Sequence, residues 1–510
     1  MEKSTEVIIE TTMGKIKGLQ QPGHQDFLGI QYAKAPVGEL RFQPPQRIDS
    51  WDDVYDSTHF GPIAPQAYPD TPPIQLEESE DCLSLNIYTP ATDGKSRPVM
   101  VFIHGGGFLI DSGSRPRTYG GPLAEAGDVV VVTIEYRMGA FGFLYVDGVS
   151  PNLGLQDQVC ALEWIQRHIR DFGGNPTNVT IFGESAGATS VAYLMVMPSA
   201  KGLFHKAILE SGAFPFESLA DNRRFAESGT RKFFKELRVA PGDLAALQAA
   251  PYAEIQRAQK KAGGRLLFSD RAFFPAIDGT VIPEDVYSAL RRGCSKDIPI
   301  IIGVNAEELP LFGLILKPGL TQTMVKNNIL RKLKKLGATG RQIKALLDLY
   351  RGSLSPQERQ TGREYNHLFS DETFRIPATL FAEAQQSAGP KIYFYCFAHP
   401  APKIQAASHV MELYFVFGTL KTTDVAEMMQ VPGTEEELRL SQAMMTAWTT
   451  FARTGDPNHP GLPEWPPYDL ERRSTIFLDL QSRAVDLPMD AIRSTWMGIV
   501  NSSIFSKSGK

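Results

Sequence analysis

Ser185 is the residue around which chemistry could be organised, because glycines stand two positions before and after it, at Gly183 and Gly187. Residues 179–183 alternate β-branched and aromatic side chains and predict a strand, whereas the small and then apolar residues after the serine predict a helix. A tight strand-to-helix turn brings backbone against backbone, so side chains at the two glycine positions would clash. Such a turn holds the serine hydroxyl at the N-terminus of the helix, where amide groups face an incoming oxyanion.

Hydrogen-bond donors for an oxyanion are predicted in a glycine-rich loop. A serine hydroxyl is a weak nucleophile at neutral pH and needs a base, an acid that orients the base, and such donors. The loop at 104–108, His-Gly-Gly-Gly-Phe, directly follows a predicted strand at 99–103, and its glycines let successive amides turn toward one point. We expect Gly106, Gly107 and Ala186 to be the donors.

Candidates for the base and the acid follow two later strands. Of the nine histidines, His399 and His409 come after a predicted strand at the right stage of the chain, and position favours His409 while leaving His399 open. Glu307 and Glu308 follow another predicted strand, and a carboxylate on that loop could reach over the sheet edge to an imidazole. Position alone does not choose between these two glutamates.

The elements that must position these residues alternate between strands and helices. Residues 99–103 and 129–134 are near-continuous apolar runs, as in strands buried on both faces, and apolar residues between 155 and 172 recur at helical spacing. Further strands are predicted at 179–183, 206–210, 298–303, 391–395 and 474–478, and a hairpin at 6–11 and 14–18. The alternation predicts an α/β fold, with a large, mostly parallel, doubly wound central sheet flanked by helices.

Two stretches, at about 215–295 and 310–390, have a different texture: they are charged and helical, without a strong strand pattern. No flexible linker separates them from the rest of the chain, so we interpret them as helical insertions beside the sheet. The sequence therefore predicts one domain over residues 1–510.

Composition excludes several classes of function. The 510 residues are 42% hydrophobic and 21% charged, with a net charge of −5, so nothing favours nucleic acid or an anionic membrane as a partner. No apolar run is long enough to span a membrane, and the first residues contain no apolar leader segment, so we expect a cytoplasmic protein. The four cysteines are widely spaced without a zinc pattern, which predicts reduced thiols and no metal site.

Many ordered motifs resemble one family. The chain is similar to the type-B carboxylesterases of the cholinesterase and carboxylesterase group of α/β-hydrolases, and among them to the bacterial para-nitrobenzyl esterases. The resemblance covers almost the whole chain. It is carried by 29–38 with Arg41-Phe42, 79–83, the glycine loop, Tyr136-Arg137 with 141–144, 152–158, 183–187, 210–212, His409 with 412–418, and Trp448 with 451–455.

The resemblance implies an α/β-hydrolase fold with Ser185 as nucleophile, Glu308 as acid and His409 as base, and it requires neither a metal nor an organic cofactor. It selects Glu308 and His409 over their neighbours. It also implies that Ser211 lies behind the triad. Arg41 and Glu80 match a buried structural ion pair of the family.

Three departures from the family pattern matter. Ala64 stands where many relatives have the cysteine that bonds to the equivalent of Cys82, so Cys82 is expected to be a free thiol. The loop between them lacks the tryptophan that cradles a quaternary ammonium in cholinesterases, which argues against choline esters as the dedicated substrate. Leu309 replaces a glycine after the acid, which predicts a narrower pocket there.

We therefore expect a serine carboxylesterase for small-molecule esters with short or medium acyl chains or aryl groups. It would form an acyl-enzyme and be a monomer or a weak dimer. Alternatives are a non-catalytic binding or adhesion protein of the same fold, and a lipase or amidase of the same superfamily. Apolar residues near the motifs predict the substrate pocket: Phe108, Phe214, Phe216, Leu309, Phe312 and Phe415.

Overall fold

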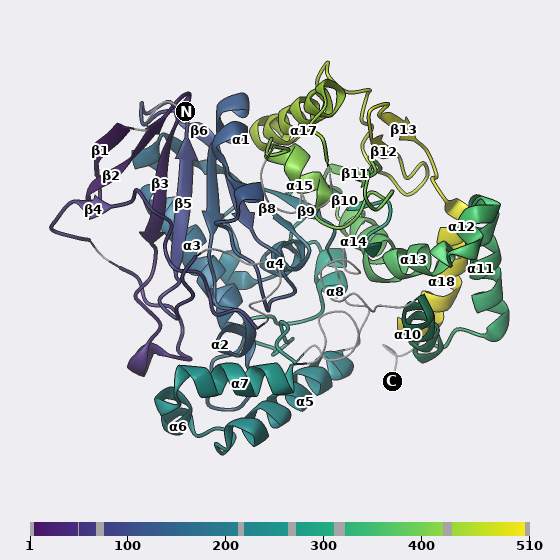
Figure 1. Cartoon of the computed structure of the whole chain (residues 1–510), viewed down its shortest axis with the longest axis horizontal. Coiled ribbons are helices and arrows are strands. Elements are labelled where there is room, and N and C mark those ends of the chain that lie inside the picture. The colour runs from purple at the N-terminus through teal and green to yellow at the C-terminus, as the bar shows by residue number, and fades with distance from the viewer. Residues whose placement is uncertain are drawn as a thin grey trace.

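The computed structural model describes residues 5–48, 50–67, 76–212, 219–263, 272–310, 322–421 and 431–504. All thirteen strands in these residues belong to one sheet (Figure 1). The strands are β1 (Thr5–Thr11), β2 (Gly14–Gln21), β3 (His24–Gln31), β4 (Tyr55–Asp56), β5 (Ser84–Thr89), β6 (Arg97–Ile103), β7 (Val130–Ile134), β8 (Gly174–Glu184), β9 (Lys206–Glu210), β10 (Ile300–Asn305), β11 (Ile392–Phe397), β12 (Thr475–Leu478) and β13 (Arg483–Val485).

The sheet order is β1-β2-β3-β5-β7-β6-β8-β9-β10-β11-β12-β13, with β4 paired to β2. From β7 to β12 every neighbouring pair is parallel, whereas the pairs from β1 to β7 and the last pair, β12 with β13, are antiparallel. The predicted mostly parallel sheet is thus confirmed. Its parallel part brings the carboxyl ends of seven neighbouring strands to one edge.

The helices are α1 (Gly121–Gly127), α2 (Gly139–Phe143), α3 (Leu153–His168), α4 (Ala186–Leu194), α5 (Leu219–Leu237), α6 (Leu244–Ala249), α7 (Tyr252–Ala262), α8 (Val286–Arg291), α10 (Gln322–Lys335), α11 (Gly340–Ser353), α12 (Pro356–Gln360), α13 (Arg363–Ser370), α14 (Ile376–Gln386), α15 (Met411–Val416), α17 (Glu435–Thr454) and α18 (Asp490–Ile504). Figure 1 shows α5, α6 and α7 together below the sheet, and α10, α11 and α18 together at its right. Among the described helices, none combines the length and apolar composition needed to cross a bilayer.

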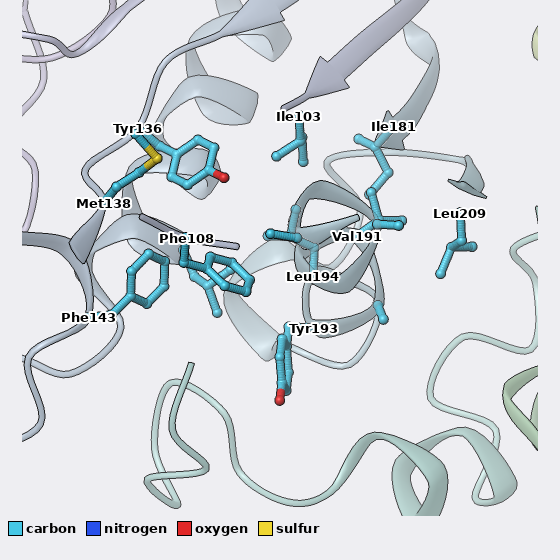
Figure 2. Packing of buried hydrophobic residues seen from close by; sticks show 14 of the residues in the cluster. Ile103, Phe108, Tyr136, Met138, Phe143, Ile181, Val191, Tyr193, Leu194 and Leu209 are labelled. Atoms are coloured by element: carbon cyan, nitrogen blue, oxygen red, sulfur yellow. The ribbon is translucent and has the colours of Figure 1, made fainter. Parts of the chain in front are cut away.

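Apolar side chains cover both faces of the central strands. Along β6, Val101 and Ile103 belong to one buried cluster and Met100 and Phe102 to another, because successive side chains of a strand point to opposite faces. We call the first the α4-side cluster, since it includes the apolar residues of α4, and the second the α17-side cluster. Figure 2 shows Ile103 beside α4 in the first cluster. Burial on both faces is the reason why these strands read as continuous apolar runs.

Four strands of the sheet were not predicted from the sequence: β3, β4, β5 and β13. Strand β5 is entirely buried although it carries a polar residue, Asn86, at its centre. That side chain is satisfied because its amide donates to the hydroxyls of Ser114 and Thr133, and its oxygen accepts from the Gly29 amide. The other predicted strands and the N-terminal hairpin are confirmed.

Two expectations attached to single residues are also confirmed. Cys82 is a buried free thiol, as are Cys160 and Cys396, and Cys294 is a free thiol at the surface. Arg41 and Glu80 form a two-pronged ion pair, with Nε to Oε2 at 2.6 Å and Nη2 to Oε1 at 2.5 Å.

Candidate active site

The residues singled out by their chemistry follow neighbouring parallel strands. The order β6-β8-β9-β10-β11 places their carboxyl ends side by side, and the register pairs Ile103 with Gly183, Glu184 with Glu210, and Asn305 with Phe397. A single edge of the sheet therefore receives the residues that leave these strands, which is where ligands bind in open α/β sheets. These residues are His104, Ser185, Ser211, Glu308 and His409.

Ser185 occupies a strained turn between β8 and α4. Its backbone torsions are φ 56° and ψ −117°, a conformation that side chains disfavour, and the residue is partly exposed. A Cβ added to Gly183 would lie 2.6 Å from the carbonyl carbon of Gly187 and 2.7 Å from the Ile103 oxygen. One added to Gly187 would collide with the Ile103 carbonyl. The two glycines thus allow three backbone segments to cross beneath the serine.

The glycine loop lies against this turn. A Cβ on Gly105 would be 3.0 Å from the Cβ of Ser185 and 2.8 Å from the Glu184 carbonyl oxygen. Gly106 and Gly107 have φ values of +87° and +63°, which only glycine adopts at little cost. The loop predicted to supply two donors is therefore in contact with the serine turn, and Ala186 begins α4 directly after the serine.

Glu308 and His409 form a buried acid–base pair. Glu308 Oε2 lies 2.7 Å from His409 Nδ1, and both side chains are shielded from solvent. Because a carboxylate can only accept a hydrogen bond, Nδ1 carries the proton. In that tautomer Nε2 has a lone pair and can accept a proton. His409 Nε2 lies 3.0 Å from Oε1 of Glu184, the residue before Ser185, so the imidazole reaches the serine turn. The Phe374 ring packs on the imidazole with centroids 4.9 Å apart.

The competing candidates lie in other contacts. His399 is held between Glu437, at 3.0 Å from Nε2, and Asp479, at 3.3 Å from Nδ1. Glu307 forms an ion pair with Arg363, whose Nε is 2.8 Å from Oε2. The residues preferred from the resemblance are the ones that this geometry brings together.

Two further carboxyl groups, those of Glu184 and Glu412, lie beside the pair, and the sequence alone predicts no role for either. Burial and the charge of Glu308 hold the pKa of Glu184 well above its ordinary value. Burial, with Glu184 and Glu308 nearby, also raises the pKa of Glu412 to about 8. Ser211 Oγ donates to Glu412 Oε1 at 3.3 Å and Asn305 Nδ2 donates to Oε2 at 2.5 Å, which satisfies this buried group.

Signals for both groups exist in the sequence. Glu184 is the neighbour of the nucleophile candidate, and Glu412 stands three residues after His409, at the start of α15. Among the described residues, no set of three or more histidine, cysteine or acidic side chains is placed to hold a metal ion.

The predicted pocket residues divide into three groups. Phe108 and Leu309 are both buried in the α4-side cluster. The Phe108 ring lies edge-on to the rings of Phe143 and Phe274, with centroid distances of 4.9 and 4.7 Å, and Figure 2 shows Phe108 beside Phe143. Phe415 belongs instead to the α17-side cluster, against the rings of Phe397 and His399, so it is a core residue on the other side of the sheet. The remaining three, Phe214, Phe216 and Phe312, lie outside the described residues.

Known proteins resemble this chain in both sequence and architecture. The family model described as "Carboxylesterase family" matches residues 5–493. The para-nitrobenzyl esterase of Bacillus subtilis is 38% identical over 93% of this chain and 95% of its own length, and carboxylesterase 1C of Rattus norvegicus is 34% identical over 91% and 88%. Among solved structures, a carboxylesterase of Geobacillus stearothermophilus superposes with a TM-score of 0.84 at 37% identity, covering 96% of this chain and 99% of that one. With its α/β-hydrolase sheet and a family match over nearly its full length, the chain belongs to the carboxylesterase family of carboxylic-ester hydrolases.

Proposed function

We propose that this protein hydrolyses carboxylic esters through a Ser185–His409–Glu308 triad and an acyl-enzyme intermediate. One observation carries the proposal: the imidazole of His409 is bonded to Glu308 through Nδ1, while Nε2 lies at Glu184, next to Ser185. The contact between serine turn and glycine loop supports it further.

In the proposed first step, His409 Nε2 takes the hydroxyl proton of Ser185 as Oγ attacks the ester carbonyl carbon. The tetrahedral intermediate collapses when the bond to the alcohol oxygen breaks, and His409 passes its proton to that oxygen. Water then attacks the acyl carbon, with the same imidazole removing its proton, and Ser185 is regenerated as the acid leaves. Glu308 keeps Nδ1 protonated and stabilises the imidazolium cation in both halves.

Negative charge on the substrate oxygen is the main barrier in both halves of the reaction. We propose that the backbone amides of Gly106, Gly107 and Ala186 bind this oxygen. Gly106 and Gly107 adopt left-handed torsions beside the serine turn, and Ala186 opens α4, whose N-terminus favours an anion. Removing one such donor typically lowers kcat by about 10² to 10³.

The proposed substrates are small-molecule esters with short or medium acyl chains or aryl groups. The named similarity to a para-nitrobenzyl esterase supports this class. We propose that the enzyme works in a reducing compartment, the cytoplasm, because all four cysteines are free thiols.

Reaction with a fluorophosphonate tests the proposal, because such reagents are attacked by activated serines. We expect intact mass to show one adduct, which is lost in Ser185→Ala and retained in Ser353→Ala, a serine on the exposed end of α11. On para-nitrophenyl acetate, Ser185→Ala and His409→Gln should lower kcat by about 10⁴ or more and Glu308→Gln by about 10⁴. Exposed His59→Gln is the control for His409 and should retain full activity.

An adduct that survives Ser185→Ala would overturn the assignment of the nucleophile. No adduct on the native protein would favour a non-catalytic binding protein of the same fold. A rate that rises with acyl length only above the onset of emulsion would identify a lipase instead.

A further inference from the structure

His104 and Glu135 meet behind the glycine loop. They follow the adjacent parallel strands β6 and β7 directly after the paired residues Ile103 and Ile134, so both side chains start from the same level of the sheet. Both are buried, and His104 Nε2 lies 3.7 Å from Glu135 Oε2.

The hydrogen bonds of His104 define its tautomer. Nδ1 lies 3.1 Å from the Gly105 carbonyl oxygen, and because a carbonyl only accepts, Nδ1 carries the hydrogen. Burial lowers the pKa of His104 to about 4, so the ring is neutral at pH 7 and Nε2 presents a lone pair. The ring is stacked on Tyr136 at 4.4 Å, and the Tyr136 hydroxyl donates to the His104 carbonyl at 2.8 Å. The imidazole therefore has little freedom to turn.

Glu135 is arranged as a donor toward that lone pair. Its Oε1 accepts from the hydroxyls of Ser112 and Ser114, at 2.6 and 3.1 Å, so a proton on this carboxyl belongs on Oε2. Burial raises the pKa of Glu135 to about 8, which keeps it protonated at pH 7. Among the described residues, neither Glu135 Oε2 nor His104 Nε2 has a hydrogen-bond partner. A separation of 3.7 Å is too short to hold a water between them, since two hydrogen bonds through a water span about 4.5 Å or more.

We propose that Glu135, acting through His104, is a positioning residue for the oxyanion-binding loop. When the 3.7 Å gap closes by about 0.7 Å, its carboxylic acid donates to His104 Nε2, while the imidazole donates to the Gly105 carbonyl oxygen. That oxygen and the Gly106 amide belong to the same trans peptide group and point in opposite directions. Holding the oxygen against His104 therefore turns the Gly106 N–H away from the core, toward the substrate. The inference rests on the proposed role of Gly106 as an oxyanion donor.

Other ionisable groups around Glu135 act on its protonation. Asp111 adds a negative charge that opposes ionisation of Glu135, although Arg115 and Arg117 pair with Asp111 and offset part of it. Cys82, Tyr88 and Tyr136 also lie within reach of the Glu135 charge, and burial holds their pKa values well above the ordinary range, so all three are neutral at pH 7. When pH rises through about 8, Glu135 loses its proton and its oxygen faces the Nε2 lone pair. The loop is then released, so activity should fall on the alkaline side.

Two substitutions of Glu135 separate hydrogen bonding from packing. In Glu135→Gln the amide oxygen can accept from both serines and the amide nitrogen can donate to His104, so we expect kcat within about threefold of native. Glu135→Met fills a similar volume without a donor, and we expect kcat to fall on the order of 30-fold with KM within about twofold, which is less than the loss of a whole oxyanion donor. The rate of fluorophosphonate labelling should fall in parallel. Glu125→Gln, at an exposed glutamate on α1, should change neither quantity.

The pH profile and an infrared spectrum complete the test. Native kcat should decline above about pH 8, and Glu135→Gln should lack that decline. The native protein should also show a C=O stretching band of a protonated carboxylic acid, and this band should be missing in Glu135→Gln. The infrared comparison does not depend on whether Glu135→Met folds. Absence of that band, native kcat in Glu135→Met, or equal damage in both variants would overturn the proposal. Failure of the native enzyme to react with fluorophosphonate would instead overturn the proposed function.

Discussion

Ser185 combines two demands on one residue, because the candidate nucleophile sits at φ 56°, where a side chain is strained. Strain of this kind costs about 1–3 kcal/mol and persists only where the surroundings enforce it. Here the Ser185 amide donates to the Glu210 carbonyl at 2.9 Å, and its own carbonyl accepts from the Thr189 amide at 3.0 Å. The serine turn is therefore held by the strand and the helix on either side of it.

Replacing Ser185 by glycine should stabilise the protein while abolishing activity. Glycine relieves the strain in the folded state, but it also raises the conformational entropy of the unfolded state. The net gain in the free energy of unfolding should therefore be about 1 kcal/mol. Ser185→Ala keeps the strain and should leave stability near the native value. Denaturant unfolding of the three proteins measures this, and equal stability of the glycine and alanine variants would show that the turn is unstrained.

The residue types of the site could be predicted from the sequence better than their partners could. Ser185 and Glu308 closely follow strands whose apolar runs are clear, His409 comes later after a third such strand, and the resemblance selects among neighbouring candidates. The roles of Glu412 and Glu135 depend on which atoms meet across the fold, and a single sequence contains no pattern for such contacts. Nearness to His409 in the sequence predicts Phe415 in the pocket, but α15 directs its side chain into the α17-side cluster.

At the scale of elements, the crossing of β6, β8 and α4 sets the geometry of the candidate site. Gly187 in α4 packs against the Ile103 carbonyl at the end of β6, with no room for a methyl group. The N-terminus of α4 can therefore lie this close to the glycine loop only because residue 187 is a glycine.

We expect Gly187→Ala to lower the free energy of unfolding by about 3 kcal/mol, because backbone must move to admit the methyl group. Activity should fall with it. The control is Gly352→Ala in α11, where a Cβ would meet nothing within 4 Å and helix propensity favours alanine. Thermal unfolding and kcat of both variants provide the measurement; a Gly187→Ala protein as stable and active as the control would refute the crossing as a constraint.

Elements could be predicted where both faces are buried and could not where polar residues interrupt the pattern. The strands β6, β7, β10 and β11 are near-continuous apolar runs. By contrast, β5 reads Ser-Leu-Asn-Ile-Tyr-Thr, and its polar side chains are buried because neighbouring strands and loops satisfy them. These hydrogen bonds form only in the tertiary structure, so the local sequence pattern does not indicate a buried strand.

At the scale of the whole molecule, strands from both ends of the chain join one sheet, and the single domain over residues 1–510 stays a prediction. Arg41 adds a connection to the first helical insertion. Besides its pair with Glu80, its Nη1 donates to the carbonyls of Gln248 and Ala250 at 2.6 and 2.7 Å, at the end of α6. One guanidinium thus joins the N-terminal segment, the 79–83 stretch and the insertion.

Removing this guanidinium should destabilise the protein as a unit. Arg41→Ala leaves the Glu80 carboxylate and two carbonyls without their donor, and we expect the free energy of unfolding to fall by about 3 kcal/mol in one cooperative transition. Arg439→Ala, at an exposed ion pair with Glu435 of 3.8 Å, should change it by less than about 0.5 kcal/mol. Chemical denaturation followed by fluorescence compares them. Two separate transitions in either protein would contradict a single domain.

The wide spacing of the site along the chain has a practical consequence. Between α10 and α11 the chain passes through an exposed turn at Gly337, which lies after Glu308 and before His409. A cut at this turn would leave the proposed nucleophile and acid on one fragment and the base on the other. Neither fragment could turn over an ester alone, so the colour released from a para-nitrophenyl substrate would report the reunion of the two halves, and the fold could serve as a split sensor for any pair of proteins fused to them.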